Sequence, residues 1–180
     1  CKATPNLTLL VDCERSIELD IRSLPEDVKQ LAFIGECVIC IKNNFLCRSL
    51  SLTKIDLSSL INVQAIEYSF LSGCSGLTKV DLGGLTRVQT IGWWFLSRCS
   101  SLTEVDLSSL TSVQVVVAYF LSGCTSLKKV NLSGLTSLRT IGNNFLDGCT
   151  GLRGVDFGNL TKEQKELISS RLTDHLKLSF

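Results

Sequence analysis

The sequence is poor in the residues that most catalytic centres use. Its 180 residues contain no methionine and one histidine, His175. A Ser/His/Asp or Cys/His arrangement needs a histidine beside its nucleophile, and a single histidine near one end of the chain has no such set around it. The GxxxxGK[ST], GxGxxG and HExxH patterns are also missing. We therefore expect no enzyme and no cofactor.

Charge is sparse and evenly mixed. Lys and Arg number 18 and Asp and Glu 17, so the net charge is +1, and like charges form no run. A nucleic-acid binder would show a basic stripe, and a membrane-surface binder a polybasic patch. The longest apolar run, 115–121 (VVVAYFL), is far shorter than the roughly 20 residues of a spanning helix. We expect neither nucleic-acid binding nor membrane insertion within this chain.

A repeat of 25 residues organises most of the chain. The stretches FLSGCSGL, FLSRCSSL, FLSGCTSL and FLDGCTGL follow one another, after a decayed copy, FLCRSLSL. Their phenylalanines are 25 residues apart: Phe45, Phe70, Phe95, Phe120 and Phe145. A fixed period of this length is the signature of a solenoid, whose units bury their hydrophobic sides only against neighbouring units.

Each unit reads LxxVDLxxLxxVxxIxxxFLxxCxx. Its LxxVxL start alternates apolar and polar residues, so Thr78, Lys79 and Asp81 face away from the apolar side. This alternation predicts a short strand, stacked in parallel on its counterparts about 4.8 Å away. The predicted fold class is an α/β solenoid with short parallel strands and mostly irregular connections.

The two ends of the chain depart from the repeat. We expect an N-terminal cap over 1–27, in which 17–21 (IELDI) alternates as a short strand does. Repeats follow over 28–160, the first of them distorted. The chain begins with Cys1 and lacks methionine, so we expect a mature form or a cut fragment.

The last segment, 161–180, is predicted to be a capping helix and tail. Thr161 is a suitable N-cap, and Gln164 completes a capping box at the start of a run of helix formers. We expect an amphipathic helix over 161–177 that covers the last repeat. The alternative is a partner-binding helix.

The nine cysteines fall into two groups. Four occupy one column of the repeat, and we expect them to fill a tight turn as small buried hydrophobes: Cys74, Cys99, Cys124 and Cys149. The other five lie within the first 47 residues. Among these, Cys37, Cys40 and Cys47 resemble half of a zinc site, but no second half accompanies them, so we expect no metal.

Two sets of residues are candidates for partner binding. The first is aromatic and lies just before the phenylalanine of three consecutive units: Tyr68, Trp93, Trp94 and Tyr119. Interface hot spots are rich in Trp and Tyr. The alternative is that a tryptophan packs under the turn. The second set is the polar strand face, whose mixed charge suits a protein partner: Lys54, Asp56, Lys79, Asp81, Glu104, Asp106, Lys129 and Asn131. We expect its aspartates to pair with the lysines two residues earlier rather than to bind cations.

The unit resembles a leucine-rich repeat over about 28–160. Its IGxxFLxxC half is similar to the surface-antigen (BspA-like, Treponema-type) class, which carries LxxIxxxxFxxC, and FLSGCSSLTxVDLS arrays occur in protist leucine-rich repeat proteins. The chain departs from the bacterial pattern at pairs such as Leu85-Thr86, where that form often has proline, and it lacks asparagine ladders. The resemblance implies a curved solenoid for protein–protein contact, often on a cell surface.

The resemblance also implies N-terminal disulfides, because capping disulfides are common in extracellular leucine-rich repeat proteins. Cys1 with Cys13, or Cys13 with Cys37 or Cys40, are the candidate pairs. We therefore expect a non-enzymatic protein-binding module that is secreted or on the cell surface. The alternative is a cytoplasmic scaffold, or the substrate-recognition arm of a larger signalling or ubiquitin-ligase protein.

Overall fold

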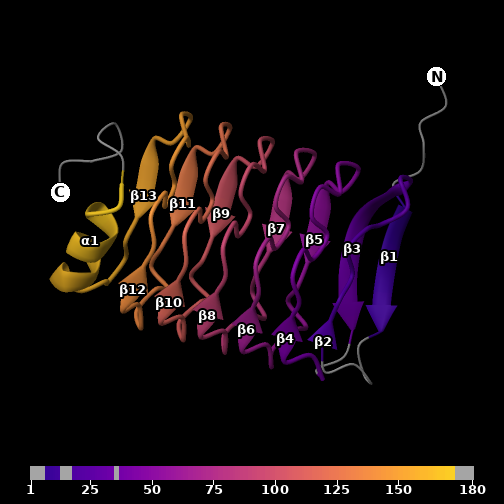
Figure 1. Cartoon of the computed structure of the whole chain (residues 1–180), viewed down its shortest axis with the longest axis horizontal. Coiled ribbons are helices and arrows are strands. Elements are labelled where there is room, and N and C mark those ends of the chain that lie inside the picture. The colour runs from indigo at the N-terminus through magenta and orange to yellow at the C-terminus, as the bar shows by residue number, and fades with distance from the viewer. Residues whose placement is uncertain (1–6, 13–17, 35–36, 173–180) are drawn as a thin grey trace.

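The structure is a computed structural model that describes residues 7–12, 18–34 and 37–172. The repeats stack side by side along one axis, and each contributes one strand to each of two rows of parallel strands (Figure 1). A helix lies at the C-terminal end of the stack. The predicted solenoid with short parallel strands and a C-terminal helix is thus confirmed.

The first row contains the strand that starts each unit. In the short strands the middle residue points into the core and the flanking polar residues point out, which is the burial pattern that alternation predicts; Ile55, Val105 and Val130 are buried. The row consists of β1 (Leu7–Asp12), β3 (Val28–Ile34), β5 (Lys54–Asp56), β7 (Lys79–Asp81), β9 (Glu104–Asp106), β11 (Lys129–Asn131) and β13 (Gly154–Asp156).

This first row divides into two sheets, β1-β3-β5-β7 and β9-β11-β13. The residue at one turn position does not account for the break between β7 and β9, because Ser59 holds the same position as Ser109 and β3 and β5 are nevertheless paired. A Cβ on Gly84 or Gly134 would lie only 2.4 or 2.2 Å from a carbonyl oxygen of the preceding unit, so glycine permits a close approach there. Ser109 has a side chain at that position, and its hydroxyl instead donates to the Leu82 carbonyl at 2.9 Å.

The second row is continuous. Its two-residue strands pair in parallel in a single sheet: β2 (Glu18–Leu19), β4 (Cys40–Ile41), β6 (Ala65–Ile66), β8 (Thr90–Ile91), β10 (Val115–Val116) and β12 (Thr140–Ile141). From β4 onward the second residue of each strand is buried in the core: Ile41, Ile66, Ile91, Val116 and Ile141. This row therefore joins the units across the break in the first row.

A column of stacked phenylalanine rings forms the centre of the core. Centroids of successive rings from Phe45 to Phe145 are 5.0 to 5.4 Å apart, and their planes lie within 10° of parallel. All five rings are fully or almost fully buried. Burial of each ring contributes about 1.5–3 kcal/mol, and aromatic pairing adds about 0.5–1.5 kcal/mol per contact.

The backbone beside this column adopts the left-handed conformation at every second residue. In one unit Trp94, Leu96 and Arg98 have φ of 59°, 51° and 59°. The Leu96 N–H donates to the preceding unit, at Phe70, whereas the Trp94 and Arg98 N–H groups donate to the following unit. Left-handed backbone costs on the order of 1 kcal/mol for a residue other than glycine. Full burial of Leu96 offsets that cost with about 1.5–3 kcal/mol.

The repeated cysteines fill the turn after the phenylalanine, as predicted. Each of the four is fully buried, and its thiol donates to the carbonyl of a leucine 28 residues earlier, at 3.1 to 3.2 Å. Burial raises the pKa of Cys74 to about 12 and also raises the pKa of Cys99. Ser49 replaces the cysteine in the decayed copy, and its buried hydroxyl has no hydrogen-bond partner among the described residues.

The ends of the stack differ in part from expectation. The described N-terminal residues extend both rows, because β1 pairs with β3 and β2 with β4. β2 lies within the strand predicted over 17–21, whereas no strand was predicted at β1. The boundary of an N-terminal cap at residue 27 stays a prediction.

At the C-terminal end, helix α1 (Lys162–Ser169) begins as predicted but is shorter. Thr161 is its N-cap, and both hydrogen bonds of the capping box with Gln164 are present. Ile168 and Leu172 are buried against the last unit. Residues 170–172 are described and are not helical, and the last part of the predicted helix, 173–177, lies outside the described residues together with His175.

We expect Ser49→Cys and Ser49→Ala each to stabilise the protein. Both remove a buried hydroxyl without a partner, and relieving one such group is worth about 1 kcal/mol. Cys should stabilise more than Ala because it refills the turn with the group the other units use. Urea unfolding followed by circular dichroism measures the difference. A loss of stability in Ser49→Ala would show that the hydroxyl has a partner.

We also expect stability to fall in alkali because of the thiol column. A thiol whose folded pKa lies above its unfolded value of about 8.5 binds its proton more tightly when folded, so its contribution is complete below that pH. The contribution declines by about 1.4 kcal/mol per pH unit and thiol as the pH rises toward the folded pKa. The free energy of unfolding, measured with urea at about pH 8 and about pH 10.5, should therefore fall less between the two pH values in Cys74→Ala/Cys99→Ala than in the unmodified chain. An equal fall in the variant and in the unmodified chain would contradict this role of the thiols.

Candidate functional site

Three aromatic side chains form an exposed cluster over two neighbouring units. Trp93, Trp94 and Tyr119 are 49%, 36% and 38% exposed. The Trp94 and Tyr119 rings stack with centroids 5.8 Å apart and planes 21° apart, and Trp93 meets Trp94 edge-on at 5.5 Å. We call these three residues the aromatic cluster. Neither tryptophan packs under the turn, which was the alternative.

The position of these residues in the repeat explains their exposure. The next residue in each unit, Phe95 or Phe120, points into the core, and the left-handed backbone at Trp94 and Tyr119 turns the chain just before it. Their N–H groups donate to Ala118 and Asn143 of the following unit, at 3.1 and 2.9 Å. The stacking distance between Trp94 and Tyr119 therefore follows from the stacking of the units.

Tyr68, the fourth aromatic candidate, stands apart. It is 44% exposed, and the ring contacts of the described chain do not join it to the aromatic cluster. It lies instead within electrostatic reach of Arg22. The pKa of Arg22 is raised chiefly by its hydrogen bond and charge interaction with Asp20, and Tyr68 adds a smaller effect.

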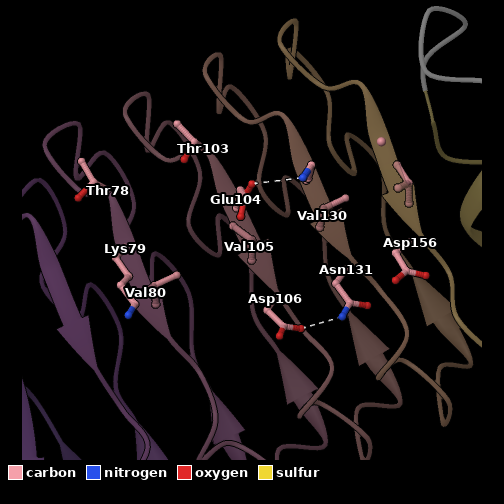
Figure 2. A pocket seen from close by; sticks show the side chains of 13 residues that line it. Thr78, Lys79, Val80, Thr103, Glu104, Val105, Asp106, Val130, Asn131 and Asp156 are labelled. Carbon is pink, nitrogen blue, oxygen red and sulfur yellow. Dashed lines mark hydrogen bonds and ion pairs between the residues drawn. The ribbon is translucent and has the colours of Figure 1, made fainter.

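The polar strand face forms an open hollow of about 690 Å³ over β7, β9, β11 and β13 (Figure 2). Lys129 pairs with Glu104 at 3.7 Å, and the Asn131 amide donates to Asp106 at 3.0 Å. Lys79 also lines this hollow. A neighbouring hollow of about 300 Å³ contains the remaining strand-face candidates, Lys54, Asp56 and Asp81. The two hollows share no residue with the aromatic cluster.

The aspartates of this face have a structural role that differs from the predicted one. Each accepts a hydrogen bond from the backbone N–H two residues later, as Asp106 does from Ser108 at 2.9 Å, and so closes the turn after the strand. Asp56, Asp81, Asn131 and Asp156 make the same contact. Within the described residues no lysine forms an ion pair with these aspartates, because the turn N–H lies nearer than a lysine two residues back.

A third hollow, of about 610 Å³, was not predicted. Six of its lining residues define what we call the arginine groove: Arg22, Arg48, Gly73, Trp94, Ser97 and Arg98. Its arginines are exposed. The sequence does contain a signal for it, since FLCRS and FLSRC carry arginine where the other copies carry glycine.

No metal site is found in the described part of the chain, where no three His, Cys, Asp or Glu side chains lie close enough to hold an ion. Six of the described cysteines are free thiols: Cys40, Cys47, Cys74, Cys99, Cys124 and Cys149. Cys1 and Cys13 lie outside the described residues, so the N-terminal pairings stay predictions. None of the helices described is long and apolar enough to cross a membrane.

Parallel units, a buried leucine and phenylalanine framework and open polar faces define a leucine-rich repeat solenoid. The model of the BspA type leucine rich repeat region matches six copies over residues 39–171. The chain therefore belongs to the BspA-type leucine-rich repeat family, as the sequence resemblance predicted.

Solved structures of two bacterial leucine-rich repeat proteins are similar to this chain. A protein from Bacteroides ovatus is 22% identical, with a TM-score of 0.40, and the match covers 79% of this chain and 49% of that one. TpLRR from T. pallidum is 16% identical, with a TM-score of 0.38, over 93% of this chain and 89% of that one. This chain thus spans about half the length of the Bacteroides protein. A search of curated proteins finds no match.

The turn contacts of the aspartates predict unequal effects of two substitutions. Asp106→Ala removes the acceptor for Ser108 N–H and for Asn131, and should lower the free energy of unfolding by about 1–2 kcal/mol. Asp106→Asn keeps a carbonyl oxygen there, as Asn131 does in its own unit, and should change stability by less than about 0.5 kcal/mol. Urea unfolding measures both. Equal losses would show that charge, not turn closure, is what matters.

Proposed function

We propose that this chain is a non-enzymatic protein-binding module that is secreted or exposed on a cell surface. The aromatic cluster carries the proposal. Three large aromatic side chains are held exposed and in mutual contact by a rigid stack, and the surrounding framework does not need them for its core. Tryptophan and tyrosine dominate the energetics of many protein interfaces because they bury a large area with few rotatable bonds.

The polar strand face is the second contact surface of the proposal. Its charges are of both signs and are open to solvent, as at the rim of an interface, where they select partners by electrostatic complementarity. Lys79, Glu104 and Lys129 would contribute this selectivity. The activity and partners of the full-length protein are part of the same proposal.

Membership of the BspA-type family supports a surface or secreted location, because repeats of this class are often found in surface antigens. Asn159, in the sequon Asn159-Leu160-Thr161, is exposed in a turn and is compatible with glycosylation. The second candidate function is an intracellular scaffold or substrate-recognition arm. The free thiols of Cys40 and Cys47 favour it.

The cluster predicts the effect of a triple substitution on partner binding. To find the partner, the chain would be cross-linked to proteins of its own source in separate surface and cytosolic fractions. Mass spectrometry would then identify the partner. Trp93→Ala/Trp94→Ala/Tyr119→Ala should weaken its binding by at least about 100-fold, as loss of several hot spots does. Calorimetry measures the affinity, and circular dichroism confirms the fold.

Ile61→Ala provides a matched control, since Ile61 is an exposed apolar side chain outside the aromatic cluster. Its binding should equal that of the unmodified chain. Unchanged affinity in the folded triple variant would remove the cluster from the proposal. A partner found only in the cytosolic fraction would favour the scaffold function.

A further inference from the structure

We propose that the arginine groove binds a short acidic peptide segment of a protein partner. This inference rests on the proposed protein-binding function and specifies the chemistry of what is bound. The groove adjoins the aromatic cluster, because Trp94 belongs to both. Partner contact would therefore extend from apolar rings to a positively charged hollow without interruption.

The charge of two of the three groove arginines is uncompensated. Three arginines line it, and no Asp or Glu does. Arg22 is paired with Asp20 at 3.0 Å, whereas Arg48 and Arg98 have no side-chain hydrogen bond or ion pair within the described residues. Two exposed guanidinium groups thus remain available to an incoming anion. A planar guanidinium binds a carboxylate through two parallel hydrogen bonds, which gives direction as well as attraction.

Both free arginines occupy positions that favour glycine. The third residue after phenylalanine has a left-handed backbone in all five units, and it is glycine in three of them: Gly73, Gly123 and Gly148. Arg48 and Arg98 adopt the same conformation, with φ of 60° and 59°. A side chain is disfavoured in this conformation. The core gains nothing from either arginine, because both are exposed.

The neighbouring glycines provide the room that these arginines need. A Cβ on Gly73 would lie 3.2 Å from the Arg48 Cγ, and a Cβ on Gly123 would lie 3.2 Å from the Arg98 Cγ. Each arginine stem therefore lies on the glycine of the following unit. The alternation of arginine and glycine along this column holds the two stems in one direction over the groove.

A short peptide fits this spacing and charge. Arg48 and Arg98 are two units apart, which is roughly 10 Å at the spacing of parallel strands. Side chains two residues apart on one face of an extended peptide are separated by roughly 7 Å, so flexible acidic side chains can reach both guanidinium groups. Two free positive charges are too few for a polyanion, whose binding relies on a larger basic field.

The test titrates the whole chain with a capped peptide that alternates glutamate and serine, and the fluorescence of Trp93 and Trp94 reports binding. We expect saturable binding that weakens as salt is added. The same peptide with glutamine in place of glutamate should bind at least about tenfold more weakly. A sulfated polysaccharide forms the second arm. Binding of the polysaccharide without the acidic peptide would overturn the inference.

Arg48→Gly/Arg98→Gly is the decisive variant because glycine is what the other three units carry. It should unfold at the same or a higher temperature, since it removes two left-handed side chains, yet bind the acidic peptide at least about tenfold more weakly. Arg87→Gln/Arg139→Gln removes the same charge outside the groove and should bind normally. Unchanged peptide binding in the glycine variant overturns the inference. If the native partner binds that variant as tightly as the unmodified chain, the inference fails while the protein-binding proposal stands.

Discussion

Stacking of one phenylalanine on the next is the contact on which the rest of the structure depends. Between β7 and β9 the first row of strands is broken, yet the Phe70 and Phe95 rings across that break are 5.0 Å apart and nearly parallel. The ring column and the second row of strands thus keep the units in register where the first row does not. A ring stack tolerates little change in spacing, which is why the period of 25 residues does not vary between units.

This constraint separates framework from surface within each unit. Phe95 and Leu96 are buried and bind the unit to its neighbours, whereas Trp94 and Arg98 lie on either side of them and are exposed. The backbone hydrogen bonds of Trp94 and Arg98 are made whatever their side chains are. These two positions can therefore carry aromatic rings or charge without loss of register, and their left-handed conformation is the main limit on what they hold.

Most of the fold could be predicted because it follows from period and alternation, which are properties of many residues together. The buried columns, the parallel strands and the capping box at Thr161 were of this kind. The role of Asp106 and the arginine groove could not be predicted in that way. Each depends on one local backbone feature: the turn N–H at Ser108 for the first, and a positive φ at Arg48 and Arg98 for the second. Neither feature changes the alternation of apolar and polar residues, so that pattern does not reveal it.

The decayed copy, 45–52, shows how far the framework allows the sequence to vary. Phe45 and Leu46 are retained and fully buried, and four consecutive residues after them depart from the repeat. Of these, Ser49 leaves a buried hydroxyl without a partner, which destabilises the unit, whereas Arg48 places a free charge over Gly73. Both depart from the same framework, but only the exposed one offers a new contact. Because Phe45 keeps the unit in register, a copy can lose stability at one position and acquire a binding group at the next.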